Sequence, residues 1–467
     1  MTKREEGEIK GKASRIMLIL LFLSMSTSAS SLHMVKAIST IHIRADGSVD
    51  PVTAPIQRNG DVFTLTGNVA SDTDGIVIER NNTILDGMGY TLQGTSAPLS
   101  NGVYLSGIGS VTIRGVKVKA FDYGIYLYNS PNNNISENEI TDNEYGIYID
   151  TYSSNIKISG NKIANNNYGI SCVLYSDDNL ILGNNITENS LVGVWIVGCS
   201  SNNISENRIV ANEQNGIRLE TSSDSSIYHN DFMGNANQVY TYDSTSVWDN
   251  GYPSGGNYWS DYAGSDNYFG PYQNQPGKDG IGDTPYNCSG NDQDRYPLMK
   301  AWTNIAIQTV SPCKTVVGQG QNVTITVSVQ NQGWDGQTTN ITVYVNATIV
   351  STFENVIIVG GSQTTLNFTW QTGTFSRGNY VISAQADPAP GETDTTDNTF
   401  QNWIIVTIKG DINGDGTVDI YDAILLAGAF NSVRGSSNWN PNADINSDGT
   451  VDIYDAIILA GNFGKKS

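Results

Sequence analysis

The middle of the chain repeats one short pattern of apolar and polar residues about every 23 positions. Each unit contains two or three short runs in which apolar and polar residues alternate, separated by Asn and Gly, with no room for a helix. Alternation with a period of two predicts strands, and Asn and Gly favour the turns between them. Two asparagine columns keep the same step: Asn138, Asn161, Asn184, Asn207 and Asn230, and Asn143, Asn166, Asn189, Asn212 and Asn235.

One such unit cannot bury its apolar face alone, but neighbouring units that stack on one another bury a continuous core. We therefore expect a right-handed parallel β-helix over residues 38–241, with one coil per unit and roughly 4.8 Å between coils. The aligned asparagines should then hydrogen-bond along the stack, because an amide both donates and accepts.

Aromatic residues recur on the outward side of one predicted strand. The column consists of Tyr104, Tyr126, Tyr148, Ser171, Trp195 and Arg218. Rings along one side of a straight helix are suited to stacking against sugar rings, so we take Tyr104, Tyr126, Tyr148 and Trp195 as candidate carbohydrate contacts. The general preference of Tyr and Trp for strands explains the same residues without a ligand.

The β-helix sequence does not identify catalytic residues. In the next outward column the carboxylates are Asp150 and Glu220, three coils apart. That is about 14 Å at roughly 4.8 Å per coil, whereas a glycosidase pair needs roughly 5–9.5 Å. The catalytic residues, if there are any, stay unknown.

After about residue 303 the 23-residue period disappears. Roughly seven alternating strands separated by Gly-rich turns follow within 303–408, and this pattern predicts an Ig-like β-sandwich.

The chain ends in two nearly identical stretches that begin at Asp411 and Asp444, 33 residues apart. Each has oxygen-bearing residues at positions 1, 3, 5, 7, 9 and 12 and Gly at position 6, which is EF-hand spacing. We therefore predict two Ca²⁺ sites, each followed by one helix. The predicted ligands are Asp411, Asn413, Asp415, Thr417, Asp419 and Asp422, and Asp444, Asn446, Asp448, Thr450, Asp452 and Asp455.

The charge and the N-terminus agree with an exported protein. The net charge of −21 argues against nucleic acid, whose phosphates need Lys and Arg. Residues 1–37 have the basic, apolar and small-residue order of a secretory signal. The apolar run of about ten residues is shorter than the roughly 20 that span a membrane, so we expect a mature chain without a transmembrane segment. Four cysteines are too few for a disulfide scaffold, although Cys288 and Cys313 are candidates for a bridge between neighbouring domains.

Three family resemblances follow from these motifs. The stretch "ILDGMGYTLQG", the "NNISEN" repeats and "WDNGYPSGGNYWSDY" resemble NosD-type β-helix proteins, which implies that 242–300 closes the helix as a cap. The sandwich, with its "GETDTTDN", resembles a CARDB domain. Residues 409–467 resemble a type I dockerin, which implies a cohesin partner that would contact Ile420, Tyr421, Ile453 and Tyr454.

These resemblances suggest what the whole chain does. NosD is linked to copper delivery, but copper prefers His, Cys and Met, and the β-helix has them only scattered. We expect a mainly β, secreted surface protein whose β-helix presents a carbohydrate-binding or adhesive face and whose dockerin tethers it to a scaffold or cell surface. The alternatives are a polysaccharide-degrading glycoside hydrolase or lyase, and a structural surface-layer element.

Overall fold

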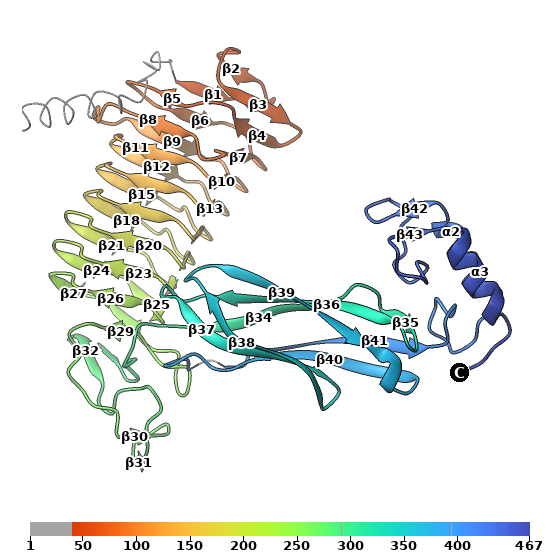
Figure 1. Ribbon diagram of the computed structural model, residues 1–467. Helices are drawn as coiled ribbons and strands as arrows, with labels where there is room; N and C mark the ends of the chain where they lie inside the picture. Colours follow the sequence, from red (N-terminus) through yellow and green to blue (C-terminus); the bar gives the residue numbers. More distant parts are fainter. Residues whose placement is uncertain (1–39, 291, 394) are drawn as a thin grey trace, which may run out of the picture.

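The computed structural model describes residues 40–467 apart from Asn291 and Asp394. The export signal predicted over 1–37 lies outside the described residues. The fold is mainly β, as expected from the alternating pattern. A column of stacked coils leads down to an irregular end, from which a β-sandwich extends sideways to a small two-helix unit (Figure 1).

The stacked coils form three sheets whose neighbouring strands are mostly parallel. The first sheet contains β1 (Ile41–Ile43), β2 (Val49–Asp50), β6 (Ile76–Ile78), β9 (Asn101–Ser106), β12 (Tyr123–Tyr128), β15 (Tyr145–Asp150), β18 (Tyr168–Val173), β21 (Val192–Val197), β24 (Asn215–Glu220) and β27 (Asn237–Tyr242). The second contains β3 (Ile56–Asn59), β4 (Val62–Leu65), β7 (Ile84–Asp86), β10 (Thr112–Arg114), β13 (Asn134–Ser136), β16 (Lys157–Ser159), β19 (Leu180–Leu182), β22 (Asn203–Ser205), β25 (Ser223–Tyr228) and β28 (Thr245–Val247). The third contains β5 (Val69–Ala70), β8 (Thr91–Gln93), β11 (Lys117–Lys119), β14 (Glu139–Thr141), β17 (Lys162–Ala164), β20 (Asn185–Thr187), β23 (Arg208–Val210), β26 (Asp231–Met233) and β29 (Tyr258–Trp259).

Asparagine ladders run through the corners of this β-helix, as predicted. Asn161 Nδ2 donates to Asn184 Oδ1 at 2.9 Å, and Asn184 Nδ2 donates to Asn207 Oδ1 at 3.0 Å. The same side chains also accept from backbone amides of the preceding coil, such as Asn161 N at 3.0 Å from Asn184 Oδ1. The second column forms the same contacts, with Asn166 Nδ2 3.2 Å from Asn189 Oδ1. Each buried amide therefore satisfies backbone groups that the sheets leave unpaired.

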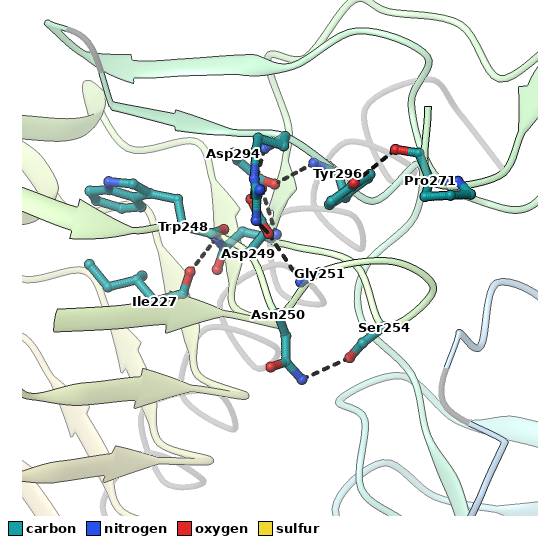
Figure 2. Close-up of polar contacts among 11 residues, drawn as sticks. Ile227, Trp248, Asp249, Asn250, Gly251, Ser254, Pro271, Asp294 and Tyr296 are labelled. Carbon is teal, nitrogen blue, oxygen red and sulfur yellow. Dashed lines mark hydrogen bonds and ion pairs between the residues drawn. The ribbon is translucent and has the colours of Figure 1, made fainter. Parts of the chain in front are cut away.

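Residues 242–300 lie across the lower end of the coils. They include β30 (Tyr268–Phe269), β31 (Gln275–Pro276), β32 (Tyr286–Ser289) and β33 (Asp292–Asp294). Trp248 and Trp259 are fully buried under the last coil. The buried Asp294 carboxylate accepts from Asn257 N at 2.7 Å and from Trp259 Nε1 at 2.9 Å. Figure 2 shows Asp294 and its neighbours in this end cap.

The sandwich pairs a three-stranded sheet with a five-stranded one. The first contains β34 (Ile305–Pro312), β36 (Asn322–Asn331) and β39 (Gln363–Gln371), and a 3₁₀ turn, η1 (Thr372–Thr374), follows. The second contains β35 (Val316–Gly318), β37 (Gln337–Val345), β38 (Thr348–Ile358), β40 (Gly378–Ala386) and β41 (Thr399–Thr407).

The candidate bridge between Cys288 and Cys313 does not form, since all four cysteines are free. The physical reason is that the two thiols belong to separate interiors. Cys288 is buried in the core of the β-helix, whereas Cys313 packs against the core of the sandwich.

The C-terminal unit is built around two ten-residue helices, α2 (Ile420–Ala429) and α3 (Ile453–Asn462), with short strands β42 (Ser432–Val433) and β43 (Thr450–Val451). Each helix begins with a capping box: Asp419 accepts from Tyr421 N, and Asp422 accepts from Asp419 N at 2.9 Å. Asp452 and Asp455 repeat the arrangement in α3. Among the described residues no helix has the length and apolar character that crossing a membrane requires.

Candidate functional sites

The first acidic loop, residues 411–422, is folded by its own predicted ligands. Asp411 accepts from Gly414 N and Gly416 N, both at 2.8 Å, and Asp415 accepts from Thr417 N at 2.8 Å. Asp422, fully buried at the start of α2, accepts from Ile412 N at 2.7 Å. These hydrogen bonds bring the two ends of the loop together. Several oxygen-bearing side chains therefore lie close to one another within one tight turn.

The second loop, residues 444–455, repeats this arrangement. Asp444 accepts from Gly449 N at 3.1 Å, Asp448 accepts from Thr450 N at 2.9 Å, and Asp455 accepts from Asn446 N at 3.0 Å. Burial raises the pKa of Asp444, and the nearby ammonium of Lys314 opposes that shift.

The donor set of both loops fits a calcium ion. Within the described residues, no group of three or more His, Cys, Asp or Glu side chains forms a metal cage by itself. EF-hand-type loops do not rely on such a group alone, because amide and backbone carbonyl oxygens complete the ligand set. Asp411, Asp422, Asp444 and Asp455 are all buried, and none forms an ion pair with another described side chain. Lys314 lies near Asp444 without forming an ion pair with it. Buried carboxylates without a paired counter-charge are costly, and a dication reduces that cost.

The two helices of this unit leave matching apolar faces uncovered. Ile420 and Tyr421 are 58% and 64% exposed, and Ile453 and Tyr454 are 57% and 63% exposed. One turn later, Ile424 and Ile457 are each 60% exposed and extend the two faces. Large apolar side chains in this number are uncommon on a surface that contacts only water, so each helix presents a candidate docking face.

The predicted aromatic column of the β-helix lies on the first sheet in the expected register. Tyr104 pairs with Tyr126, Tyr126 with Tyr148, and Ser171 with Trp195. The ring centroids of Tyr104 and Tyr126 are 5.3 Å apart, and those of Tyr126 and Tyr148 are 5.4 Å apart. Ser171 is buried within this column.

A second aromatic column lies beside the first and was missed by the sequence analysis. Tyr123, Tyr145 and Tyr168 stack with centroid distances of 5.2 and 4.9 Å, and Trp195 stacks on Tyr168 at 5.1 Å. The first Tyr of "YGIYL" and "YGIYI" recurs in neighbouring repeats, and this recurrence was the sign of a second column in the sequence. The strict alternation of sides does not hold at the glycine, because the rings of Tyr123 and Tyr126 lie on the same side, with centroids 4.9 Å apart. Gly124 between them is buried, and a Cβ there would lie 2.5 Å from the carbonyl oxygen of Gly146.

The hydroxyl groups of Tyr126 and Tyr148 stay protonated. Burial, and then the hydrogen bond to Asp150, raise the pKa of Tyr126 far above its ordinary value, and burial does the same for the pKa of Tyr148. Tyr126 Oη donates to Asp150 Oδ2 at 2.9 Å. The rings largely cover one another's faces, so the surface offers edges and hydroxyl groups over most of its length.

The two carboxylates of the neighbouring column are already engaged. Asp150 accepts from Tyr126, and Glu220 pairs with Arg218 at 2.5 Å and accepts from Trp195 Nε1 at 3.2 Å. They do not form a catalytic pair.

Three family models match the chain. The periplasmic copper-binding protein (NosD) model matches residues 68–264, the CARDB model matches 305–402, and the dockerin type I domain model matches 409–463. The resemblances predicted from the sequence are thereby confirmed at the expected regions. The dockerin match implies calcium binding and a cohesin partner, and together with the NosD match it indicates an extracellular or cell-surface location.

Solved structures resemble parts of the chain. A CARDB domain from Pyrococcus furiosus, solved in complex with di-metal ions, is 23% identical, with coverage of 23% of this chain and 94% of that one and a TM-score of 0.21. The periplasmic alginate epimerase AlgG is 16% identical, with coverage of 39% and 50% and a TM-score of 0.29. The A-module of the Azotobacter vinelandii mannuronan C-5 epimerase AlgE4 is 17% identical, with coverage of 43% and 57% and a TM-score of 0.27. At these values the similarities carry no functional argument. No curated protein matches the chain.

Proposed function

We propose that this protein is a modular surface protein that is anchored by a calcium-dependent docking unit and that presents a carbohydrate-binding face on its β-helix. The observation that carries the anchoring half is the pair of equally exposed apolar faces on α2 and α3, each following a loop of buried, unpaired carboxylates. The sandwich connects the two halves (Figure 1).

The docking unit would bind two Ca²⁺ ions. Asp411, Asn413, Asp415, Thr417, Asp419 and Asp422 would hold one ion, and Asp444, Asn446, Asp448, Thr450, Asp452 and Asp455 the other. Calcium supplies positive charge that offsets the repulsion of the carboxylates, so that each loop closes and fixes the start of its helix.

The partner would be a cohesin that docks on Ile420 and Tyr421 or, equivalently, on Ile453 and Tyr454. Because the two faces have nearly the same residues and exposure, one partner surface fits either of them. Dockerins often have Ser-Thr at these positions, so an apolar cohesin surface suits the Ile-Tyr pairs of this chain.

The aromatic surface would bind an extended polysaccharide. Tyr104, Tyr126, Tyr148 and Trp195, with Tyr123, Tyr145 and Tyr168 beside them, cover five successive coils of the first sheet. Four steps of roughly 4.8 Å give a length of about 19 Å, enough for several sugar units along the axis. Protonated hydroxyl groups and ring edges suit the mixed polar and apolar surface of a sugar chain.

Glycan-array binding with the full chain tests the carbohydrate half. We expect binding of one polysaccharide class that falls at least tenfold in the double variant Tyr126→Ala, Tyr148→Ala, given about 1.4 kcal/mol per factor of ten. Tyr272→Ala in the end cap, where the ring is 82% exposed, is the matched control and should bind normally. Release of reducing sugar from the bound glycan would instead support the enzyme alternative.

Calcium titration of the full chain tests the anchoring half. We expect binding of two ions by calorimetry and capture by an immobilised cohesin in Ca²⁺ but not in chelator. Capture that is equal in both conditions would contradict the proposal.

A further inference from the structure

The sandwich contacts the second loop through a buried lysine. Lys314, only 4% exposed, follows β34 and points into residues 444–447. Its Nζ donates to the backbone carbonyl of Asp444 at 2.5 Å and to Ser447 Oγ at 2.8 Å. The ammonium group therefore lies directly against the loop whose first predicted calcium ligand is Asp444.

Neighbouring contacts hold this lysine in place. The side-chain oxygen of Asn442 accepts from Thr315 N at 3.0 Å and from Val316 N at 3.1 Å. Gln321 Nε2 also donates to the carbonyl of Ile445. The segment around Lys314 and the beginning of the second loop thus form one hydrogen-bonded interface, and the charge cannot easily move away.

The first loop touches the same sandwich through neutral groups. Thr407 Oγ1 donates to Asp411 Oδ2. Gly414 packs so closely on the sandwich that a Cβ there would lie 2.9 Å from Ile405 Cδ1 and 3.1 Å from Val316 Cγ2. Position 4 of the first loop thus meets aliphatic side chains, whereas Ser447 at the same position of the second loop meets an ammonium group.

We propose that Lys314 makes the second loop the weaker of two calcium sites in the intact chain, so that calcium fills the first loop before the second. This rests on the calcium sites proposed above. A dication that binds beside a fixed positive charge is repelled, and solvent and salt screen that repulsion weakly when the charge is buried. The first loop has a hydroxyl donor at its interface with the sandwich in place of the ammonium group. The lysine beside it, Lys466, pairs with Thr417 through its backbone and is exposed, so water and salt screen its charge.

Calorimetric titration of full-length single-site variants with CaCl₂ at low salt tests the order. Asp448→Ala leaves the first loop intact, and Asp415→Ala leaves the second. We expect the first loop to bind about tenfold more tightly than the second, an effect typical of one nearby charge. Adding Lys314→Gln, which keeps a hydrogen-bond donor but removes the charge, should tighten the second loop by about tenfold and leave the first within twofold.

Ser447→Gly is the matched control, because it gives the second loop the residue of the first at position 4. The difference in calcium affinity between the two loops should persist in this variant, since Lys314 remains. If it disappears, the loop sequence sets the affinity and the proposal is wrong.

Salt dependence gives a second test without any change to Lys314. Raising KCl from about 0.05 to 1 M should leave most of the difference in calcium affinity between the two single-site variants in place, because salt screens a buried charge weakly. Equal affinities, a difference that disappears at 1 M KCl, or a Lys314→Gln variant that binds calcium more weakly at the second loop would each overturn the proposal. If neither loop binds calcium, the proposed anchoring function itself fails.

Discussion

The β-helix and the docking unit both consist of repeats, but the repeats are stabilised in opposite ways. Each 23-residue coil shares one core and its asparagine ladders with the coils on either side. The two docking repeats, 33 residues apart, are separate loop–helix units, each with its own carboxylates and its own exposed face. Stacked coils therefore vary freely on their outer surface, whereas each docking repeat keeps nearly every residue.

The differences between the docking repeats occur where their surroundings differ. Over twenty positions they differ only at Gly414/Ser447, Leu425/Ile458 and Ala429/Asn462. The first pair contacts two different parts of the sandwich, one aliphatic and one charged. Ile458 packs against the core of the unit, while Leu425 is 38% exposed. The two repeats are thus identical at the proposed calcium ligands and docking faces. They differ at positions that contact other parts of the chain.

The largest expected effect comes from removing both docking faces. Adding Ile453→Asp and Tyr454→Asp to Ile420→Asp and Tyr421→Asp should abolish cohesin binding, because charges buried in a docked interface cost several kcal/mol. Either pair alone should weaken binding only about twofold, since one of two equivalent modes remains. Calorimetric titration with a cohesin measures both. A tenfold loss from a single pair would mean that the faces are unequal or act together.

Breaking a ladder in the middle of the β-helix should have the next largest effect. Asn184→Ala removes the acceptor of Asn161 N and Nδ2 and the donor to the carbonyl of Ile158 at 2.9 Å. Unsatisfied buried groups cost about 1–3 kcal/mol each, so we expect about 2–4 kcal/mol less stability in denaturant unfolding. The exposed Asn237→Ala should change stability by less than about 0.5 kcal/mol. Equal losses would mean that the ladders do not stabilise the stack.

One buried carboxyl group in the last coils should make the stability of the β-helix depend on pH. Asp231 is buried in β26, where Oδ1 accepts from Trp302 N at 2.7 Å and Oδ2 has no hydrogen-bond partner among the described residues. Burial raises its pKa from 3.8 to about 7. The folded carboxyl therefore keeps a proton that the unfolded chain releases between these values, and stability falls as pH rises through that window.

The expected loss between pH 5 and 7 is about 2 kcal/mol. Thermal melting of the wild type and of Asp231→Asn at both pH values measures it. The amide variant cannot ionise at residue 231, so its slope should be clearly smaller than that of the wild type. The remaining slope is expected from Asp294, whose pKa burial also raises to about 7. An unchanged slope would mean that Asp231 does not contribute.

The smallest effect compares the two loops directly. Gly414→Ser adds a side chain at φ +77° against Ile405 and should cost about 1–2 kcal/mol through strain and crowding. Ser447→Gly, at φ 64°, relaxes its backbone but removes one acceptor of Lys314 Nζ, so we expect a smaller net loss of stability, below about 1 kcal/mol, in the thermal unfolding of the calcium-loaded protein. Equal losses of stability in the two variants would mean that the contacts of the two loops with the sandwich do not differ at position 4.

Repetition made most of the fold predictable from the sequence. A pattern that recurs every 23 residues fixes strands, corners and ladders at once, and EF-hand spacing fixes the candidate calcium ligands and the helix starts. The second aromatic column was not predictable from alternation, because Tyr123 and Tyr126 lie on the same side of the strand although three positions separate them. The close approach of Gly124 to Gly146 in the next coil is visible only in the folded chain.

Contacts between the domains could not be predicted, because the residues that make them show no recurring pattern in the sequence. Lys314 is a single lysine in "SPCKTVV", and only the folded chain buries it against the second loop. The sequence left the pairing of Cys288 and Cys313 open for a related reason: proximity along the chain did not show that the two residues enter different cores.

The short linker between the sandwich and the docking unit has a mechanical consequence. β41 ends at Thr407 and the first loop begins at Asp411, and Ile408 between them is already buried in the core of the docking unit. A force applied to the docking unit would therefore be transmitted directly to β41, because almost no flexible linker separates them. This strand is paired with β40 over eight residue pairs and with β35 on its other side. Tension would shear these hydrogen bonds together, which resists force better than peeling them apart one by one.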